Sequence, residues 1–283
     1  SGFYLFYYQV IVGLNILLIF LASTIFVVYN AVNDPLFGFL IDRNMRFTRK
    51  YGRRFPWIVI GIVPWCFSIY LLFSVPDFDV SSNPWPAFLW LLMSLFVYDT
   101  FGTLVGININ TIRPDKFRTE KERRIFTKYY VPLDISSVIF GIVLSALFID
   151  IIPGDKKASY QIMGTVVAIF CLIFAILSLP GNREDEIMIE RYFSPEIEKK
   201  GISFFQALKG IITLRSFIVY FIYGVAYGVS LALIVPNLMY VITFVLQESS
   251  DAYILILGLN LLGTLISVPF WLKFINKVND NKK

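Results

Sequence analysis

The chain has 283 residues, of which 57% are hydrophobic and 16% charged, and its formal net charge is +5. Soluble domains carry about 25% charged residues, so this composition excludes an ordinary soluble domain and indicates a chain solvated by lipid. The sequence contains no His, which excludes His-ligated zinc or haem and Ser–His–Asp triads. We therefore expect no cofactor, no resident metal and no enzyme. Cys66 and Cys171 lie in apolar runs and are predicted to be buried thiols.

Apolar stretches long enough to cross a bilayer, about 20 residues each, recur along the whole chain. In chain order they are 14–40, 56–75, 86–110, 129–149, 160–180, 216–246 and 252–275. A shorter apolar piece, 2–12, precedes them, and we interpret it as the outer half of a helix whose start is missing. The sequence thus predicts an all-α polytopic membrane protein with about 7.5 helices.

The basic residues are expected to mark one side of the membrane. Every Lys and Arg except Lys156 and Lys157 falls in loops 41–55, 111–128 and 181–215 or in the C-terminal end. Cytoplasmic loops carry the excess of Lys and Arg, so we expect these segments to be cytoplasmic and the protein to lie in the cell (plasma) membrane. The net charge then follows from topology and contact with the lipid bilayer, without a nucleic-acid partner.

Segment 181–215 is the one long polar stretch, and its end, 204–209, is typical of an amphipathic interfacial helix. Helices followed by a long linker and further helices are the layout of two-bundle transporters. We predict an N-terminal six-helix bundle over 1–180 with an incomplete first helix, a cytoplasmic linker over 181–215, and the first two helices of a C-terminal bundle over 216–283.

Three acids, Asp34, Asp99 and Asp134, fall inside predicted spans. An ionisable side chain at bilayer depth costs at least about 2.5–3.5 kcal/mol and needs a reason. No Lys or Arg lies at comparable depth, so the expected partners are neutral polar groups, another acid, a bound cation or a proton.

Asp34 has the most informative neighbours. Asn30, Asn33 and Asp34 share one helix face at about 100° per residue, and Pro35 leaves the Ala31 carbonyl without its helical partner. Carboxylate, amide and carbonyl oxygens are the ligands that a hard cation prefers. The alternative is that Asp34 caps or kinks the helix close to water.

Asp99 lies deeper and is followed by the small residues Gly102 and Thr103, which permit close helix approach. Its alternative interpretation is a hydrogen-bonded packing residue, and the same alternative holds for Asp134 and, more strongly, for Asn237. The loop after the first full span is predicted to form an ion-pair latch that breaks when the bundles move, or else to be a plain basic loop; its residues are Gly38, Asp42, Arg43, Arg53 and Arg54.

These residues resemble the major facilitator superfamily and, within it, the glycoside–pentoside–hexuronide:cation symporters (melibiose permease-like). The matching segments are 30–38, 42–43, 52–57, 98–100, 120–123 and 203–209. The resemblance covers essentially the whole chain but only about two-thirds of a family member. We therefore expect a fragment that lacks the start of helix 1 and helices 9–12.

The resemblance implies twelve helices in two bundles, a central substrate site, alternating access, and a monomer when full length. It assigns cation coupling to Asp34 and Asp99, with Asn33 beside them and Asn30 where the family has another acid. This departure removes one negative charge and favours proton coupling or a weaker cation site over sodium. The candidate substrate-binding residues in this sequence are Asp99, Thr103, Asp134, Tyr227 and Asn237. Thr103 replaces an expected aromatic, and the family's helix-five arginine has no counterpart.

The leading hypothesis is a secondary active transporter that couples a cation, proton or sodium, to symport of a small solute such as a sugar or glycoside. An alternative is a lysolipid or amphiphile transporter of the same fold, motivated by the Phe- and Tyr-rich helices and the missing sugar-site residues. A further alternative is a truncated membrane protein that does not transport. No paired-acid motif or nucleophile–base pair supports a membrane enzyme.

Overall fold

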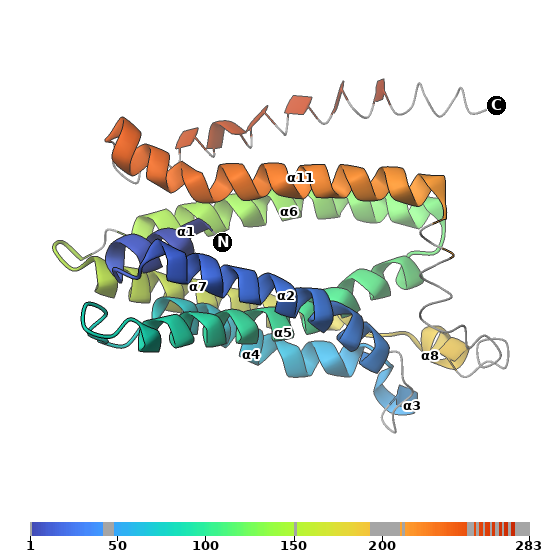
Figure 1. Cartoon of the computed structure of the whole chain (residues 1–283). Helices are drawn as coiled ribbons and strands as arrows, with labels where there is room; N and C mark the ends of the chain where they lie inside the picture. The colour runs from blue at the N-terminus through green and yellow to red at the C-terminus, as the bar shows by residue number, and fades with distance from the viewer. Residues whose placement is uncertain are drawn as a thin grey trace.

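The computed structural model describes residues 2–41, 48–149, 152–192, 210, 213–247, and helical residues at 252, 255–256, 258–260, 262–263, 266–267, 269–270 and 273–274. Every regular element in these ranges is a helix (Figure 1). The predicted amphipathic segment 204–209 lies outside the described residues.

The chain begins with α1 (Gly2–Phe6), which continues as a π-helix, η1 (Tyr7–Ile11). A turn at Gly13, whose φ is 80°, leads into α2 (Ile16–Ile41). The next elements are α3 (Thr48–Tyr51), α4 (Phe55–Phe73), α5 (Trp85–Lys116), α6 (Glu120–Ile149), α7 (Lys156–Ser178), the 3-10 helix η2 (Leu179–Asn182) and α8 (Glu186–Tyr192). Beyond them are α11 (Arg215–Tyr240) and the π-helix η3 (Val241–Leu246).

Five of the described helices are long and apolar enough to cross a membrane. They span Ile16–Gly38, Phe55–Phe73, Trp85–Lys116, Glu120–Ile149 and Lys156–Asn182. These confirm the first five predicted spans. The predicted span 216–246 is helical through α11 and η3, whereas 252–275 is described only in part.

The basic stretch 111–128 differs from its sequence prediction as a loop, because most of it is helical. α5 extends to Lys116, and α6 begins at Glu120. The Glu122 carboxylate accepts hydrogen bonds from the backbone N–H groups of Arg118 and Thr119, while the Thr119 hydroxyl accepts from the Glu122 N–H. This reciprocal capping box satisfies N–H groups that a helix start leaves without partners. α6 therefore begins within the basic stretch, at Glu120, nine residues before the start of the apolar stretch that was predicted from residue 129.

α4 packs against both α5 and α7, and glycines let these helices approach closely. A Cβ atom on Gly61 would lie 2.8 Å from a Val105 methyl group, and one on Gly164 would lie 2.8 Å from the Phe73 Cβ. The two predicted buried thiols meet at the α4–α7 contact. Cys66 is buried, Cys171 is partly buried, their sulfur atoms are 3.4 Å apart, and both are free.

At the other end of these helices, the α4–α5 loop is tied to α7. Lys157 Nζ donates to Asp77 Oδ1 at 2.6 Å and to the Pro76 carbonyl at 3.1 Å. The Lys157 hydrogen bond, followed by the charge of Lys157, lowers the pKa of the exposed Asp77 carboxyl below its usual range.

A lowered folded-state pKa means that the ionised Asp77 stabilises the fold above its unfolded-state pKa, and this contribution is lost as the pH falls through the folded-state value. We expect Lys157→Met to lower the unfolding midpoint slightly at pH 7. The difference from wild type should shrink at pH 3, because the contribution declines once the pH is below the unfolded-state pKa of the carboxyl. Thermal unfolding at the two pH values measures this, and an equal difference at both would show that Lys157 acts through packing alone.

Candidate functional site

The α2–α5 contact brings together the polar residues of two membrane helices that run side by side in the same direction (Figure 1). The hydrogen-bonded pairs Asn30–Asp99 and Asp34–Thr103 have the same sequence offset. One helical turn along α2 therefore corresponds to one turn along α5, as expected for parallel helices in register.

Asp99 is the centre of this contact. Its side chain is only 9% exposed, and Asn33 beside it is 4% exposed. Asn30 Nδ2 donates to Asp99 Oδ1 at 2.6 Å, and Asn33 Nδ2 donates to Asp99 Oδ2 at 3.1 Å. Each carboxylate oxygen thus has one amide donor, which satisfies a buried charge with neutral groups. Within the described part of the chain, Asp99 has no basic partner.

The hydrogen-bond partner of Asp34 is Thr103 and not a group beside Asp99. Asp34 lies one helical turn beyond Asn30 on α2. Its Oδ1 accepts a hydrogen bond of 2.9 Å from the Thr103 hydroxyl, and its side chain is exposed. The hydroxyl groups of Tyr29 and Thr100 are hydrogen-bonded to each other beside Asp99. The Tyr29 ring also stacks on Phe96, with ring centroids 4.3 Å apart. The predicted common face of Asn30, Asn33 and Asp34 therefore serves two different partners on α5.

The polar groups at this site are carboxylates, hydroxyls and side-chain amides. Among the described residues, no group of three or more His, Cys, Asp and Glu side chains is placed to hold a metal ion. The α2–α5 site instead offers two carboxylates, Asp34 and Asp99, with amide and hydroxyl groups between them. Such oxygens suit a hard monovalent cation that must bind and leave again.

The remaining predicted substrate residues lie apart from Asp99. Asp134 on α6 is exposed and accepts a hydrogen bond of 3.1 Å from the Tyr130 hydroxyl. Asn237 Nδ2 donates to the Leu233 carbonyl of its own helix at 2.6 Å, and Tyr227 stacks on Tyr223. The last two are on α11, which packs against α1. The structure brings Asn30, Asn33, Asp99, Asp34 and Thr103 together, but within the described residues none of Asp134, Tyr227 and Asn237 is hydrogen-bonded to them.

A second polar constellation joins the helix ends where α2 and α5 finish and α7 leads into α8. Glu184 is 5% exposed, and its Oε2 accepts from the backbone N–H groups of Arg54 at 2.8 Å and Phe55 at 3.1 Å. These N–H groups open α4, where a carboxylate is stabilised by the helix dipole. Gly52 has a φ of 88°, and a Cβ atom there would overlap the Glu184 carboxylate. Gly52 thus makes room for this helix cap.

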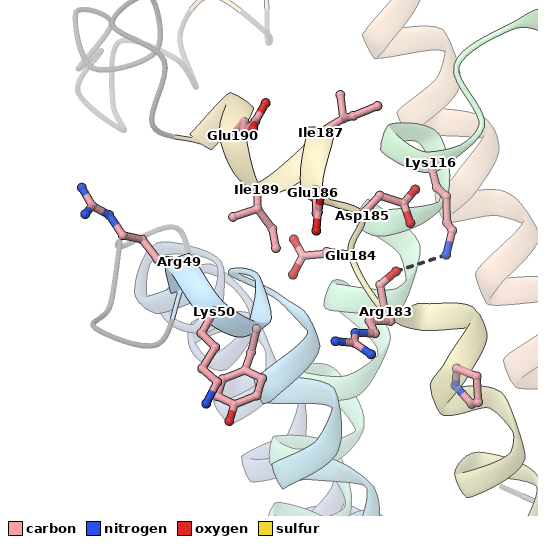
Figure 2. Close-up of a pocket in the computed structure, with 12 residues that line it drawn as sticks. Arg49, Lys50, Lys116, Arg183, Glu184, Asp185, Glu186, Ile187, Ile189 and Glu190 are labelled. Carbon is pink, nitrogen blue, oxygen red and sulfur yellow. Dashed lines mark hydrogen bonds between the residues drawn. The ribbon is translucent and has the colours of Figure 1, made fainter.

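Lys116 holds the same segment from the other side. Its Nζ donates to the Gly181 carbonyl at 3.0 Å and to the Arg183 carbonyl at 3.1 Å. Figure 2 shows Lys116 reaching Arg183 while Glu184 points toward the α3–α4 segment. We call Gly52–Phe55, Lys116 and 181–184 the basic-end junction. A cavity of about 760 Å³ lies beside it, lined on one side by Arg49 and Lys50 and on the other by acids of α8.

The latch expected from the sequence is only partly visible. Asp42 and Arg43 lie outside the described residues, and Gly38 is within α2, where an added Cβ atom would meet nothing within 4 Å. Arg54 is buried at the junction, with Arg53 beside it. The residue that sequence reasoning missed is Glu184, which it placed in a solvated linker. The available signal was Gly52, which precedes two arginines and the helix start at Phe55–Pro56, where backbone N–H groups need an acceptor.

The chain is similar to several curated transporters. It is 23% identical over 184 residues to an uncharacterised symporter of Synechocystis sp., an alignment that covers 62% of this chain and 33% of that protein. It is 21% identical over 275 residues to sodium-dependent lysophosphatidylcholine symporter 1 of Mus musculus, covering 88% of this chain and 50% of that protein. For the Gallus gallus protein of the same name the identity is 22% over 280 residues, covering 88% and 51%. The chain spans about half the length of these symporters, or less.

A sequence profile of the MFS/sugar transport proteins matches residues 1–280, nearly the whole chain. This match and the long apolar helices confirm an integral membrane protein of the major facilitator fold. The narrower glycoside–pentoside–hexuronide assignment stays a prediction, as do the domain boundaries at 180 and 215. Because this match covers nearly the whole chain, the chain belongs to the MFS/sugar transport protein family.

Proposed function

We propose that this chain forms part of a secondary active transporter that couples a monovalent cation to symport of a solute by alternating access. The observation that carries the proposal is the buried Asp99 carboxylate, held by Asn30 and Asn33 of the neighbouring helix. A buried charge in a membrane helix marks a functional site by default, because its cost must be balanced by a gain elsewhere.

Asp34 and Asp99 are the coupling residues in this proposal. They lie on two helices of one bundle, one turn apart along a shared register, with Thr103 bound to Asp34. A cation that enters here meets carboxylate and hydroxyl oxygens, and it neutralises charge that the helices otherwise bear alone. In this proposal the basic end of the bundle, which includes the basic-end junction, faces the cytoplasm of the cell membrane, as the distribution of Lys and Arg favours.

The first candidate solute is a small sugar or glycoside, in keeping with the family description. The second is an amphiphile such as a lysolipid. Two observations favour it: the relatives from Mus musculus and Gallus gallus are named as lysophosphatidylcholine symporters, and α11 carries aromatic rings in stacked pairs, Phe217–Phe221 and Tyr223–Tyr227, of which Phe221, Tyr223 and Tyr227 are exposed. Such rings offer apolar surface to an acyl tail.

Uptake by the gene product that contains this chain, reconstituted in liposomes, tests both parts. We expect accumulation of labelled solute when an inward sodium or proton gradient is imposed, and none when the gradient is collapsed. Applying the two gradients separately identifies the coupling ion. Uptake of equal size without any gradient would contradict cation coupling, and binding without uptake would indicate a protein that does not transport.

Competition separates the solutes. Lysophosphatidylcholine that blocks uptake or displaces a bound probe, where melibiose and other sugars do not, would establish the amphiphile. Inhibition by sugars alone would establish the sugar. A non-hydrolysable alkyl sugar below its micellar concentration is the control for detergent-like effects of the lysolipid.

A further inference from the structure

The orientation of the two amides at Asp99 has a consequence for the coupling step. Both Asn30 and Asn33 direct their nitrogen atoms, not their oxygen atoms, at the carboxylate. The N–H groups of an amide carry partial positive charge, and here they occupy one hydrogen-bonding position on each carboxylate oxygen. The amides therefore do electrostatically, and only in part, what a bound cation would do in full.

The same two residues are also potential ligands. An amide carries a donor at one end and an acceptor at the other, and the two ends are almost equal in size. A half-turn about the Cβ–Cγ bond exchanges them without changing how the side chain packs, and this torsion has a broad two-fold preference. Asn33 is 4% exposed, and the end point of this rotation fills the same volume in the helix contact.

The two orientations are suited to opposite states of the site. With no cation present, a carbonyl oxygen turned toward Asp99 would repel the carboxylate, so the donor orientation is favoured. With a cation between the side chains, an N–H group turned toward it would be repelled, and the carbonyl oxygen becomes a ligand. Occupancy and orientation are thus linked through charge alone.

We propose that Asn30 and Asn33 hold the place of the coupling cation: their N–H groups bind Asp99 in the empty site, and their carbonyl oxygens coordinate the cation after both amides rotate. This inference rests on the proposed coupling role of Asp99. It gives Asn30 a role that an ionised acid could not perform, because a second carboxylate at 2.6 Å from Asp99 Oδ1 would have no hydrogen to donate. The empty carrier then stays neutralised in part while it reorients.

Infrared difference spectroscopy tests the rotation directly. The gene product that contains this chain is labelled with 13C-asparagine, reconstituted, and compared with and without sodium. We expect sodium to shift asparagine side-chain carbonyl bands, because coordination weakens the C=O bond. The shifted bands should be lost in part in Asn30→Ala and in Asn33→Ala. The matched control is Asn182→Ala, which removes a partly exposed amide whose Nδ2 donates to the Ser178 carbonyl at 3.0 Å, and it should leave the bands unchanged.

Binding of radioactive sodium to the same samples separates the outcomes. Sodium binding that shifts no asparagine carbonyl band would overturn the proposed rotation, and it would leave the coupling role of Asp99 intact. Failure of the wild type to bind sodium would also overturn it, and proton-driven uptake that depends on Asp99 would then preserve the proposed function. Uptake that persists in Asp99→Asn would remove the proposed function itself.

Discussion

Replacing Asp99 by asparagine is expected to abolish gradient-driven uptake by the gene product that contains this chain, while the protein still folds and reaches the membrane. The substitution keeps the size of the side chain and removes its charge. Removing one partner of a buried charge pair costs about 3–5 kcal/mol, and at about 1.4 kcal/mol per factor of ten this weakens cation binding at least 100-fold. The new amide still meets Asn30 and Asn33, so the helix contact is retained.

Uptake and cation dependence in liposomes measure this effect, with folding checked by thermal unfolding of the purified protein. Asp79→Asn is the matched control. It neutralises an exposed carboxyl in the α4–α5 loop, whose pKa is lowered by hydrogen bonds from Ser82, and it should transport normally. Normal uptake by Asp99→Asn would exclude this carboxylate from coupling and leave it as a packing residue.

The Gly52→Ala substitution is expected to have the largest effect on stability. The new Cβ meets the Glu184 carboxylate, and the φ of 88° is one that L side chains rarely adopt. Strain of this kind costs about 1–3 kcal/mol, and loss of a helix cap costs about 0.5–2 kcal/mol. Together they predict that the free energy of unfolding falls by roughly 3 kcal/mol, and we expect the basic-end junction to open first.

Gly154→Ala separates the strain from the collision. Gly154 also has a positive φ, of 85°, but its added Cβ would meet nothing within 4 Å. We therefore expect Gly154→Ala to lower the unfolding midpoint less than Gly52→Ala. In a Glu184→Ala background, Gly52→Ala should cost only its strain, so the two substitutions should be non-additive. Equal effects of the two glycines, or strict additivity, would show that Glu184 does not depend on the space at Gly52.

Part of the α2–α5 site could be predicted from one helix alone. The 100° spacing places Asn30, Asn33 and Asp34 near one another, because local periodicity is a property of the helix itself. Which of them faces Asp99 depends on the register between two helices whose contacting residues are 66 to 71 positions apart. That register is set by packing along the whole α2–α5 contact. The spacing of residues within α2 therefore could not predict that Asp34 pairs with Thr103 and not with Asp99.

The basic-end junction shows the same limit more strongly. Gly52 and Pro56 were noted only within the segment 52–57 that resembles the family, and the hydrogen bonds from Arg54 and Phe55 to Glu184 join positions about 130 apart. Glu184 looked like one acid of a balanced polar linker, since nothing in its neighbours marks it as buried. Its role follows from the end of α7 being brought beside the start of α4.

The amino-acid sequence alone predicts that this chain is embedded in a membrane, where its apolar helices lie and which segments carry the positive charge. Long apolar stretches have no other way to satisfy their backbone in a bilayer, so these features are local and additive. Only the tertiary structure decided which neutral groups satisfy Asp99, that Asp34 has its own partner, and that Glu184 caps α4. Each of these depends on the relative position of helices far apart in the chain, where small shifts in packing decide which side chains meet.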